Sequence, residues 1–124
     1  MAVDTLTPAS RAMQHIVDLL EAAGITATRD AGAFFPRPVG VLVALPSLTS
    51  RLLAARTFTM PVLIVSGNPL NSSRNVDLVY ALADEVLAAL PGEGTYFPSS
   101  WRSAPNVEPL PAVEITVTAT VPEE

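Results

Sequence analysis

Two stretches of the chain carry apolar residues at helical spacing. In the first, Thr7 and Pro8 are typical of a helix start, because Thr is a favoured N-cap and Pro fits the first helical position. Gly24 is placed to end this helix, with Ile25 as the apolar residue that often follows such a glycine. The pattern predicts a helix over residues 8–23, with an apolar face formed by Met13, Ile16, Val17 and Leu20.

The second helical stretch begins at Ser72 or Ser73, either of which can cap a helix N-terminus. Pro91 and Gly92 end it. The apolar positions between these limits fall on one stripe, which is expected to face a sheet. The stripe consists of Val76, Val79, Tyr80, Ala83, Val86, Leu87 and Leu90.

Several other stretches have the patterns of β-strands. Residues 39–45 and 61–66 are apolar on both faces, which favours covered strands, and Pro61 is expected at the start of the second. Residues 112–121 alternate strictly between apolar and polar, which predicts a strand with one covered and one wet face. Residues 25–29 form a short strand candidate. Residues 51–59 fit either an amphipathic turn or a long strand.

The order of these elements predicts an α+β fold. We expect a mostly antiparallel sheet of about four to five strands with two helices packed on one face. Residues 1–124 fit a single domain by length. Within it, residues 1–6 are a loose lead-in, residues 92–111 a long Pro-rich loop with room for a short strand at 95–101, and residues 122–124 a charged tail.

Composition narrows the class of function. The chain is 49% hydrophobic with a mean hydropathy of +0.39, which favours burial of surface against other subunits. No apolar run approaches the roughly 18 residues that cross a bilayer, so no membrane partner is expected. The net charge is −5, and the seven arginines are scattered, which argues against nucleic-acid binding. There is no lysine and no cysteine, so disulfides and thiolate metal sites are excluded.

The stretch SGNPLNSS, residues 66–73, joins an apolar strand to a helix start, as phosphate-binding loops do. A P-loop, however, needs further glycines and a lysine. Here Gly67 is alone, and Pro69 lacks the N–H that a phosphate cradle would use. The only histidine, His15, lies off the apolar face of its helix. We therefore predict no catalytic residue, no cofactor and no metal site, and interpret the stretch as a structural corner.

Candidate contact residues lie in the segments between the main elements. Arg51 and Arg56 fall in the segment 46–60, which is expected to form an arm-like loop, and Tyr96, Trp101 and Arg102 fall in 92–111. Tyr, Trp and Arg are enriched at interface hot spots, so these five residues are the predicted protein-interface residues. For Phe97 and Trp101 the alternative is that their side chains fold down onto the core. Residue type does not decide between this packing role and an interface role.

The order of elements resembles the tail terminator proteins of long-tailed bacteriophages. Four features carry the resemblance: the first helix, glycine stop and short strand in MQHIVDLLEAAGITATRD; the proline-flanked strand in PRPVGVLVALPSL; the strand, polar corner and long helix in PVLIVSGNPLNSSRNVDLVYALADEVLAAL; and the alternating strand VEITVTATV. Together they span nearly the whole chain. They match in size and pattern, and none is a signature motif.

The resemblance implies a structural virion protein without catalysis. Such proteins form a homo-hexameric ring on the tail tube, end its polymerisation and provide the surface that docks to the filled head. The implied partners are its own copies, the tail tube protein and head–tail connector proteins, with DNA only passing through the lumen. The implied location is the neck end of the virion tail, after assembly in the host cytoplasm. The alternatives are another head–tail connector or neck protein, or a small α+β ligand-binding protein or enzyme.

Overall fold

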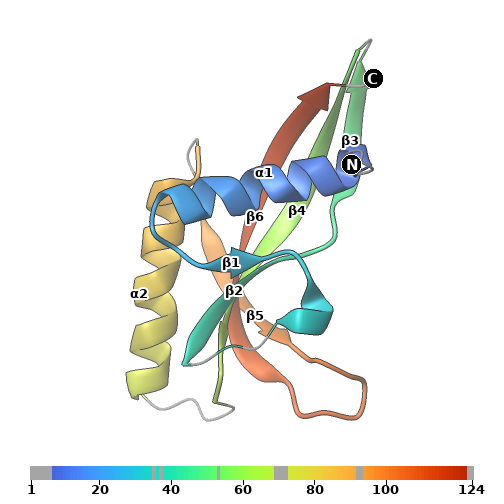
Figure 1. The fold of residues 1–124 in the computed structure, drawn as a ribbon. Coiled ribbons are helices and arrows are strands. Elements are labelled where there is room, and N and C mark those ends of the chain that lie inside the picture. The colour runs from blue at the N-terminus through green and yellow to red at the C-terminus, as the bar shows by residue number, and fades with distance from the viewer. Residues whose placement is uncertain are drawn as a thin grey trace, which may run out of the picture.

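The computed structural model describes residues 7–34, 36, 38–52, 54–68, 73–91 and 94–122 (Figure 1). The helices are α1 (Pro8–Ala22) and α2 (Ser73–Ala89), with a single 3₁₀ turn, η1 (Ala31–Ala33). The strands are β1 (Ala27–Thr28), β2 (Val39–Val43), β3 (Ser47–Leu52), β4 (Ala55–Ser66), β5 (Tyr96–Trp101) and β6 (Leu110–Pro122). The predicted α+β class is confirmed.

The strands form one six-stranded sheet in the order β1-β2-β4-β6-β5, with β3 pairing the remaining length of β4. Every pair is antiparallel except β1 with β2, which is parallel. The sheet has more strands than the four to five predicted because residues 47–66 form a hairpin of two strands. β5 matches the short strand predicted at 95–101 inside the Pro-rich stretch 92–111, and β6 begins at Leu110.

Local sequence signals at α1 act as predicted. The Thr7 side chain accepts a hydrogen bond from the Ser10 N–H at 3.2 Å, which satisfies one of the free donors of the first turn. Gly24 adopts φ +84°, and its N–H donates to the Glu21 carbonyl. The Ile25 N–H donates back to the Leu20 carbonyl at 2.9 Å. This pair of bonds is a Schellman motif, which closes the helix C-terminus and starts the chain toward β1.

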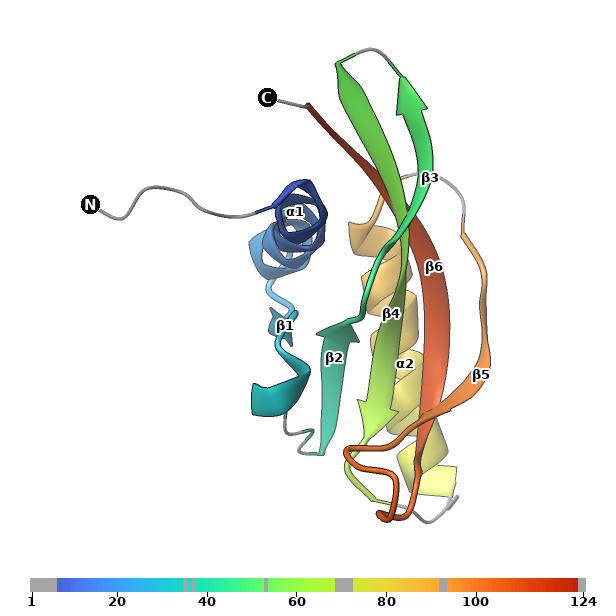
Figure 2. The same cartoon turned by 90° about the vertical axis from the view of Figure 1, so that its right-hand side faces the viewer.

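Both helices pack on the same face of the sheet, as predicted, and we call this the helix side. In Figures 1 and 2, α1 crosses the strands and α2 runs crosswise to it along one flank. The main core lies between the helices and the sheet. The fully buried residues at its centre include Ile16, Leu20, Met60, Val62, Ile64, Val86 and Ile115. Val76 was predicted to lie on the apolar stripe of α2. It lies near the start of that helix, and its side chain is 37% exposed.

A smaller apolar cluster covers part of the opposite face, which we call the back face. Leu42, Leu63, Val65 and Ala112 are buried there. Partly buried residues pack against them, including Phe34 from the segment after η1 and Trp101 from the end of β5. This cluster explains why residues 39–45 and 61–66 are apolar on both faces: one face meets the helices and the other meets the back-face cluster.

The segment 46–60 is not the arm-like loop that was predicted. It forms β3 and the first half of β4, so the strand alternative for 51–59 is the correct one, interrupted by the turn at the hairpin tip. β3, residues 55–60 of β4 and residues 116–122 of β6 form a three-stranded projection, which we call the arm. Figure 1 shows the arm extending past the helices.

Pro61 lies inside β4, so its predicted place at a strand start was wrong. Its carbonyl accepts a hydrogen bond from the Ala44 N–H at 2.9 Å. The nitrogen and carbonyl of one strand residue point to the same flank, so the Pro61 nitrogen faces the gap between the end of β2 and the start of β3. Neither β2 nor β3 pairs with Pro61 there, so β4 tolerates a residue that has no N–H to donate at this position.

Candidate interaction surfaces

The polar chemistry of the described residues is sparse. Within the described ranges, no group of three or more His, Asp or Glu side chains could hold a metal ion, and Ser66 is the only buried polar residue. Ser66 Oγ donates to the Asn68 carbonyl and accepts from the Asn68 N–H, so its hydroxyl holds the turn after β4. His15 is exposed on α1, as its place off the apolar face predicted.

The corner after β4 is built by close backbone packing. The Gly67 N–H donates to the Pro38 carbonyl at 2.7 Å, which ties the end of β4 to the start of β2. A Cβ atom on Gly67 would overlap the Pro36 carbonyl oxygen. Glycine is therefore required here for space. Residues 69–72 of the corner, which include Pro69 and Ser72, lie outside the described residues.

The five predicted interface residues occupy three separate places. Arg51 of β3 and Arg56 of β4 are direct partners near the tip of the hairpin, so the structure brings these two together. Tyr96 lies at the start of β5, beside α2. Trp101 and Arg102 lie at the opposite end of β5. Their part in contacts between proteins stays a prediction.

Trp101 and Arg102 make contacts within the protein. The Trp101 ring meets Phe34 edge to face, with centroids 5.0 Å apart and planes at 87°. Trp101 is thus partly buried on the back-face cluster, in line with the core alternative, whereas Phe97 remains 47% exposed. Arg102 Nη1 donates to the Pro105 carbonyl at 2.8 Å, which holds the loop between β5 and β6.

Tyr96 is joined to α2 by a polar contact. Its hydroxyl donates a hydrogen bond to Asp84 Oδ1 at 3.0 Å, and its ring centroid lies 5.5 Å from that of Tyr80. The hydrogen bond to the Asp84 carboxylate, followed by loss of hydration and the nearby charges of Asp84 and Tyr80, raises the pKa of Tyr96 above its ordinary value. A raised pKa means that the protonated, donating form is favoured in the folded protein.

The Tyr96–Asp84 contact gives a testable pH dependence. Its stabilisation is fully present below the ordinary tyrosine pKa of about 10 and is lost as the pH rises through the higher folded pKa. Tyr80→Phe leaves Tyr96 as the only tyrosine. In that background, Asp84→Asn is expected to lower the Tyr96 pKa toward its ordinary value in a tyrosinate absorbance titration. Glu85→Gln, at the adjacent exposed carboxylate, is the control, and equal midpoints in both variants would contradict the contact.

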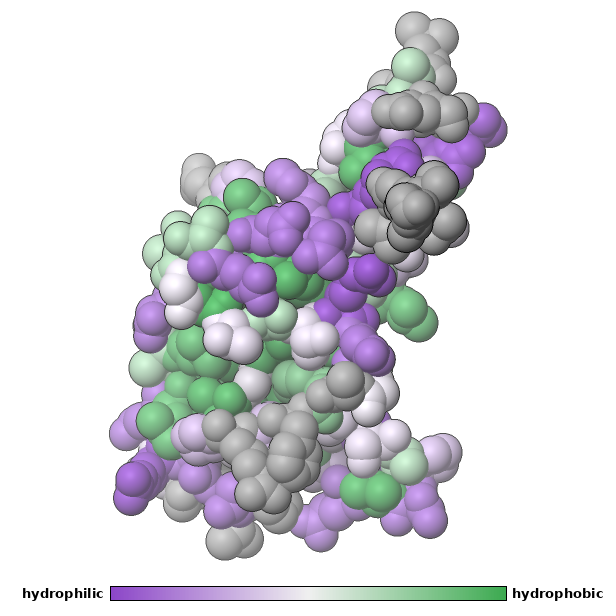
Figure 3. All heavy atoms as spheres, in the orientation of Figure 1, coloured by the Kyte–Doolittle hydropathy of each residue, from purple (hydrophilic) through white to green (hydrophobic). Residues whose placement is uncertain are grey.

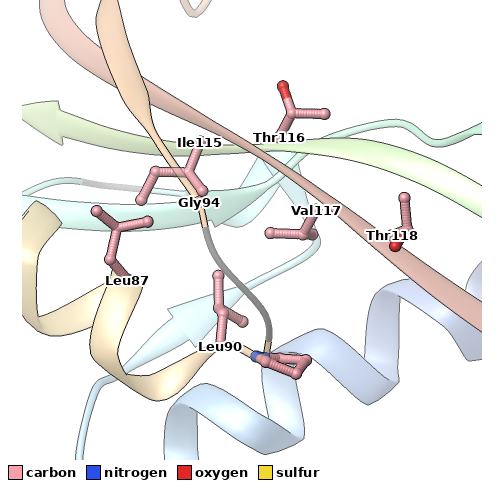
Figure 4. Close-up of a pocket in the computed structure, with 8 residues that line it drawn as sticks. Leu87, Leu90, Gly94, Ile115, Thr116, Val117 and Thr118 are labelled. Atoms are coloured by element: carbon pink, nitrogen blue, oxygen red, sulfur yellow. The ribbon is translucent and has the colours of Figure 1, made fainter.

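A groove runs between the end of α2 and one flank of β6 (Figure 4). Its volume is about 410 Å³. Among the described residues, no charged side chain lines it, and Leu87 and Leu90 give it an apolar wall on the side of α2. The lining residues are Leu87, Leu90, Pro91, Gly94, Ile115, Thr116, Val117 and Thr118. Such a groove suits an apolar side chain better than a charged ligand.

The flank of β6 that borders this groove is an open strand edge. β5 pairs with β6 only from Leu110 to Ile115, and no described strand pairs with that flank beyond Ile115. Pro61 turns its carbonyl away from β6 and lies opposite Thr116. In a non-hydrogen-bonded antiparallel pair of this kind, the backbone polar groups of each residue point away from the other strand. Thr116 and the alternate residues Thr118 and Thr120 therefore present backbone groups to the open flank.

Exposed apolar residues cluster at the opposite flank of the arm. Leu45, just before β3, is 82% exposed, and Leu48 on β3 is 51% exposed. Figure 3 shows hydrophobic residues on the body where the helices meet the sheet, and hydrophilic residues over much of the arm. The groove and the extent of the open edge could not be predicted from local patterns, because both depend on where β5 stops along β6.

Comparisons with known proteins leave the family open. No protein-family model matches the chain, and a search of curated proteins finds no significant match. Among the described residues, no helix is long and apolar enough to span a bilayer.

Proposed function

We propose that this protein is a structural subunit that assembles into a ring at the end of a phage tail tube, where it ends tube polymerisation and provides the head-docking surface. The observation that carries the proposal is the arm, which projects from the helix-covered body and whose two flanks are paired by no strand of the described residues. Open edges of this kind are ready-made sites for pairing with another chain.

The chemistry of the described residues supports an interaction role. Buried groups that could be tuned for acid–base work are lacking there, since the only buried polar residue is Ser66 and its hydroxyl serves a turn. The binding features that the described residues offer are instead a groove that they line without charge, strand edges and exposed leucines. These features favour contacts with protein chains over contacts with small polar substrates.

The charge balance supports a ring that passes DNA. The chain carries a net charge of −5, and the arginines of the described residues are spread over α1, β3, β4, α2 and the loops. A ring of acidic subunits repels phosphates, so DNA slides through its lumen without sticking. Specific DNA binding would need a clustered basic face, which the chain's charge does not favour.

Removal of the gene from its virus tests the proposal. Particles assembled without the protein are expected to have overlong tails, or tails that fail to join heads, when viewed by negative-stain electron microscopy. Supplying the wild-type protein from a plasmid should restore tails of one length joined to heads. Normal virions in the absence of the protein would reject the proposal.

Imaging of the virion separates the remaining alternatives. Labelled copies located on the head side of the joint would identify a neck or connector protein instead of a terminator. Copies absent from the virion, together with saturable binding of a small molecule, would favour the ligand-binding or enzyme alternative.

A further inference from the structure

The arm has two open edges on opposite flanks. β4 is its central strand, with β3 on one side and β6 on the other. β3 pairs with β4 alone, and residues 116–122 of β6 lie beyond the reach of β5. Among the described residues, both flanks therefore lack a partner strand over closely similar lengths.

The two edges are complementary in shape. The flank of β6 borders the apolar groove formed with Leu87 and Leu90 of α2. On β3, Leu48 lies opposite Phe58, whose side chain belongs to the main core, so Leu48 also points to the helix side. One flank thus presents an exposed leucine and the other an apolar recess, both on the same face of the same sheet.

The β6 edge is unusually unprotected. Natural edge strands are often guarded by charges, prolines or bulges. Residues 116–121 read Thr-Val-Thr-Ala-Thr-Val, with no charge and no register shift against β4, and proline comes only at position 122. Arg11 Nη2 donates to the outward Pro122 carbonyl at 2.9 Å, which closes the end of the edge and leaves the rest available.

We propose that β3 of one copy adds to the open edge of β6 on a second copy, with Leu48 seated in the groove beside Val117. Main-chain hydrogen bonds from the alternate threonines would supply the pairing, and the groove would supply the register. The claim that this contact joins neighbours in a ring rests on the proposed function. The claim that two copies make the contact does not, and it can be tested by itself.

The direction of the added strand follows from the sheet. β3 and β6 both run antiparallel to β4, so they run parallel to each other. A second copy that keeps its helix side on the same face, as Leu48 requires, brings its β3 to β6 in parallel.

The contact is heterologous, because it joins two different surfaces. Each copy retains one free β3 edge and one free β6 edge, so the contact repeats until a ring closes or a filament grows. A symmetric contact of β6 with β6 would instead close at two copies. This difference gives the experiment its readout.

Engineered cysteines can detect the contact cleanly, because the chain has no cysteine. Ser50 lies opposite Thr57 and Thr118 lies opposite Thr59, so both side chains are on the back face. A mixture of Ser50→Cys and Thr118→Cys copies, one carrying a size tag, is expected to form a mixed disulfide dimer under mild oxidation. Thr116→Cys and Thr120→Cys scan the neighbouring registers.

The matched controls separate specific pairing from random collision. Ser100→Cys, an exposed site on β5, should give no enrichment when mixed with Ser50→Cys. Each single variant alone should stay uncrosslinked. No mixed disulfide at any of the three β6 positions, or efficient dimerisation of Thr118→Cys alone, would overturn the proposal.

A backbone variant gives an independent test. Thr118→Pro removes an outward N–H that the described ladders do not use, so the protomer should keep its circular dichroism spectrum and fold. Self-association, measured by analytical ultracentrifugation, is expected to weaken by about tenfold or more, because proline cannot donate the interchain hydrogen bond. Thr118→Val, which keeps the N–H, is the control, and equal association of both variants would contradict the proposal.

The outcomes separate this contact from the proposed function. If the protein is needed for tails of normal length but no mixed disulfide forms, the strand-addition contact is disproved and the terminator role stands. If the mixed disulfide forms but loss of the protein does not alter the tails, the contact stands and the terminator role is disproved.

Discussion

Ile64→Ala is expected to lower the free energy of unfolding by about 2–5 kcal/mol. Ile64 is fully buried on β4, between Val41 of β2 and Val113 of β6, on the face that both helices cover. Truncation there removes apolar contacts and leaves a cavity that a central strand, paired on both flanks, cannot easily collapse. Urea denaturation followed by circular dichroism measures the loss.

Two variants calibrate this result. Ile64→Val deletes a single methylene and is expected to cost about 0.5–1.5 kcal/mol. Leu78→Ala, at a side chain 36% exposed on α2, should stay within about 0.5 kcal/mol of the wild type. A loss in Ile64→Ala no larger than that of Leu78→Ala would contradict the placement of Ile64 at the centre of the core.

Elements with local signals could be predicted from the sequence. Thr7, Pro8 and Gly24 bound α1 because caps and glycine stops act within a few residues. The alternation of residues 112–121 gave both the strand and its covered face: Val113, Ile115, Ala119 and Val121 are buried. The placement of both helices on one face followed from the order of the helices and strands along the chain.

Features set by strand pairing over long distances could not be predicted. Pro61 favoured a strand start by its residue type, and only the gap between β2 and β3 makes it acceptable inside β4. Residues 46–60 lacked clean alternation because β3 has a register shift between Leu48 and Ser50 and carries polar residues on an edge. Strand pairing of this kind depends on partners far along the chain, which local patterns do not encode.

The groove and the open edge of β6 also depend on strand pairing over long distances. Residue type pointed to Arg51, Arg56, Tyr96, Trp101 and Arg102, whose role between proteins stays a prediction. Tyr96, Trp101 and Arg102 also make contacts within the protein, with Asp84, Phe34 and Pro105 respectively. The groove and the open edge of β6 exist because β5 ends its pairing at Ile115 while β6 continues. The alternation of residues 112–121 placed the threonines of β6 on the wet face of a strand, but it did not show that their backbone groups border an open edge.

Gly67→Ala is expected to lower the free energy of unfolding by about 1–3 kcal/mol, as overpacking of a tight site does. The added methyl group would overlap the Pro36 carbonyl oxygen and lie 3.2 Å from that of Pro38. Both obstacles are backbone atoms, so no side-chain rotation relieves them. The Gly67 N–H also donates to Pro38 at 2.7 Å, and displacement of the corner would weaken this link between β4 and β2.

Gly32→Ala is the matched control for this variant. Its Cβ would meet only the Asp30 side-chain oxygen at 3.3 Å, which can move aside. Chemical denaturation should therefore show a clear loss for Gly67→Ala and a small one for Gly32→Ala. Neither substitution touches the open edge of β6, so the Ser50–Thr118 disulfide should still form in both at concentrations of denaturant where they stay folded. Equal stability of the two variants would show that the corner after β4 can open, and would remove the steric reason for glycine at position 67.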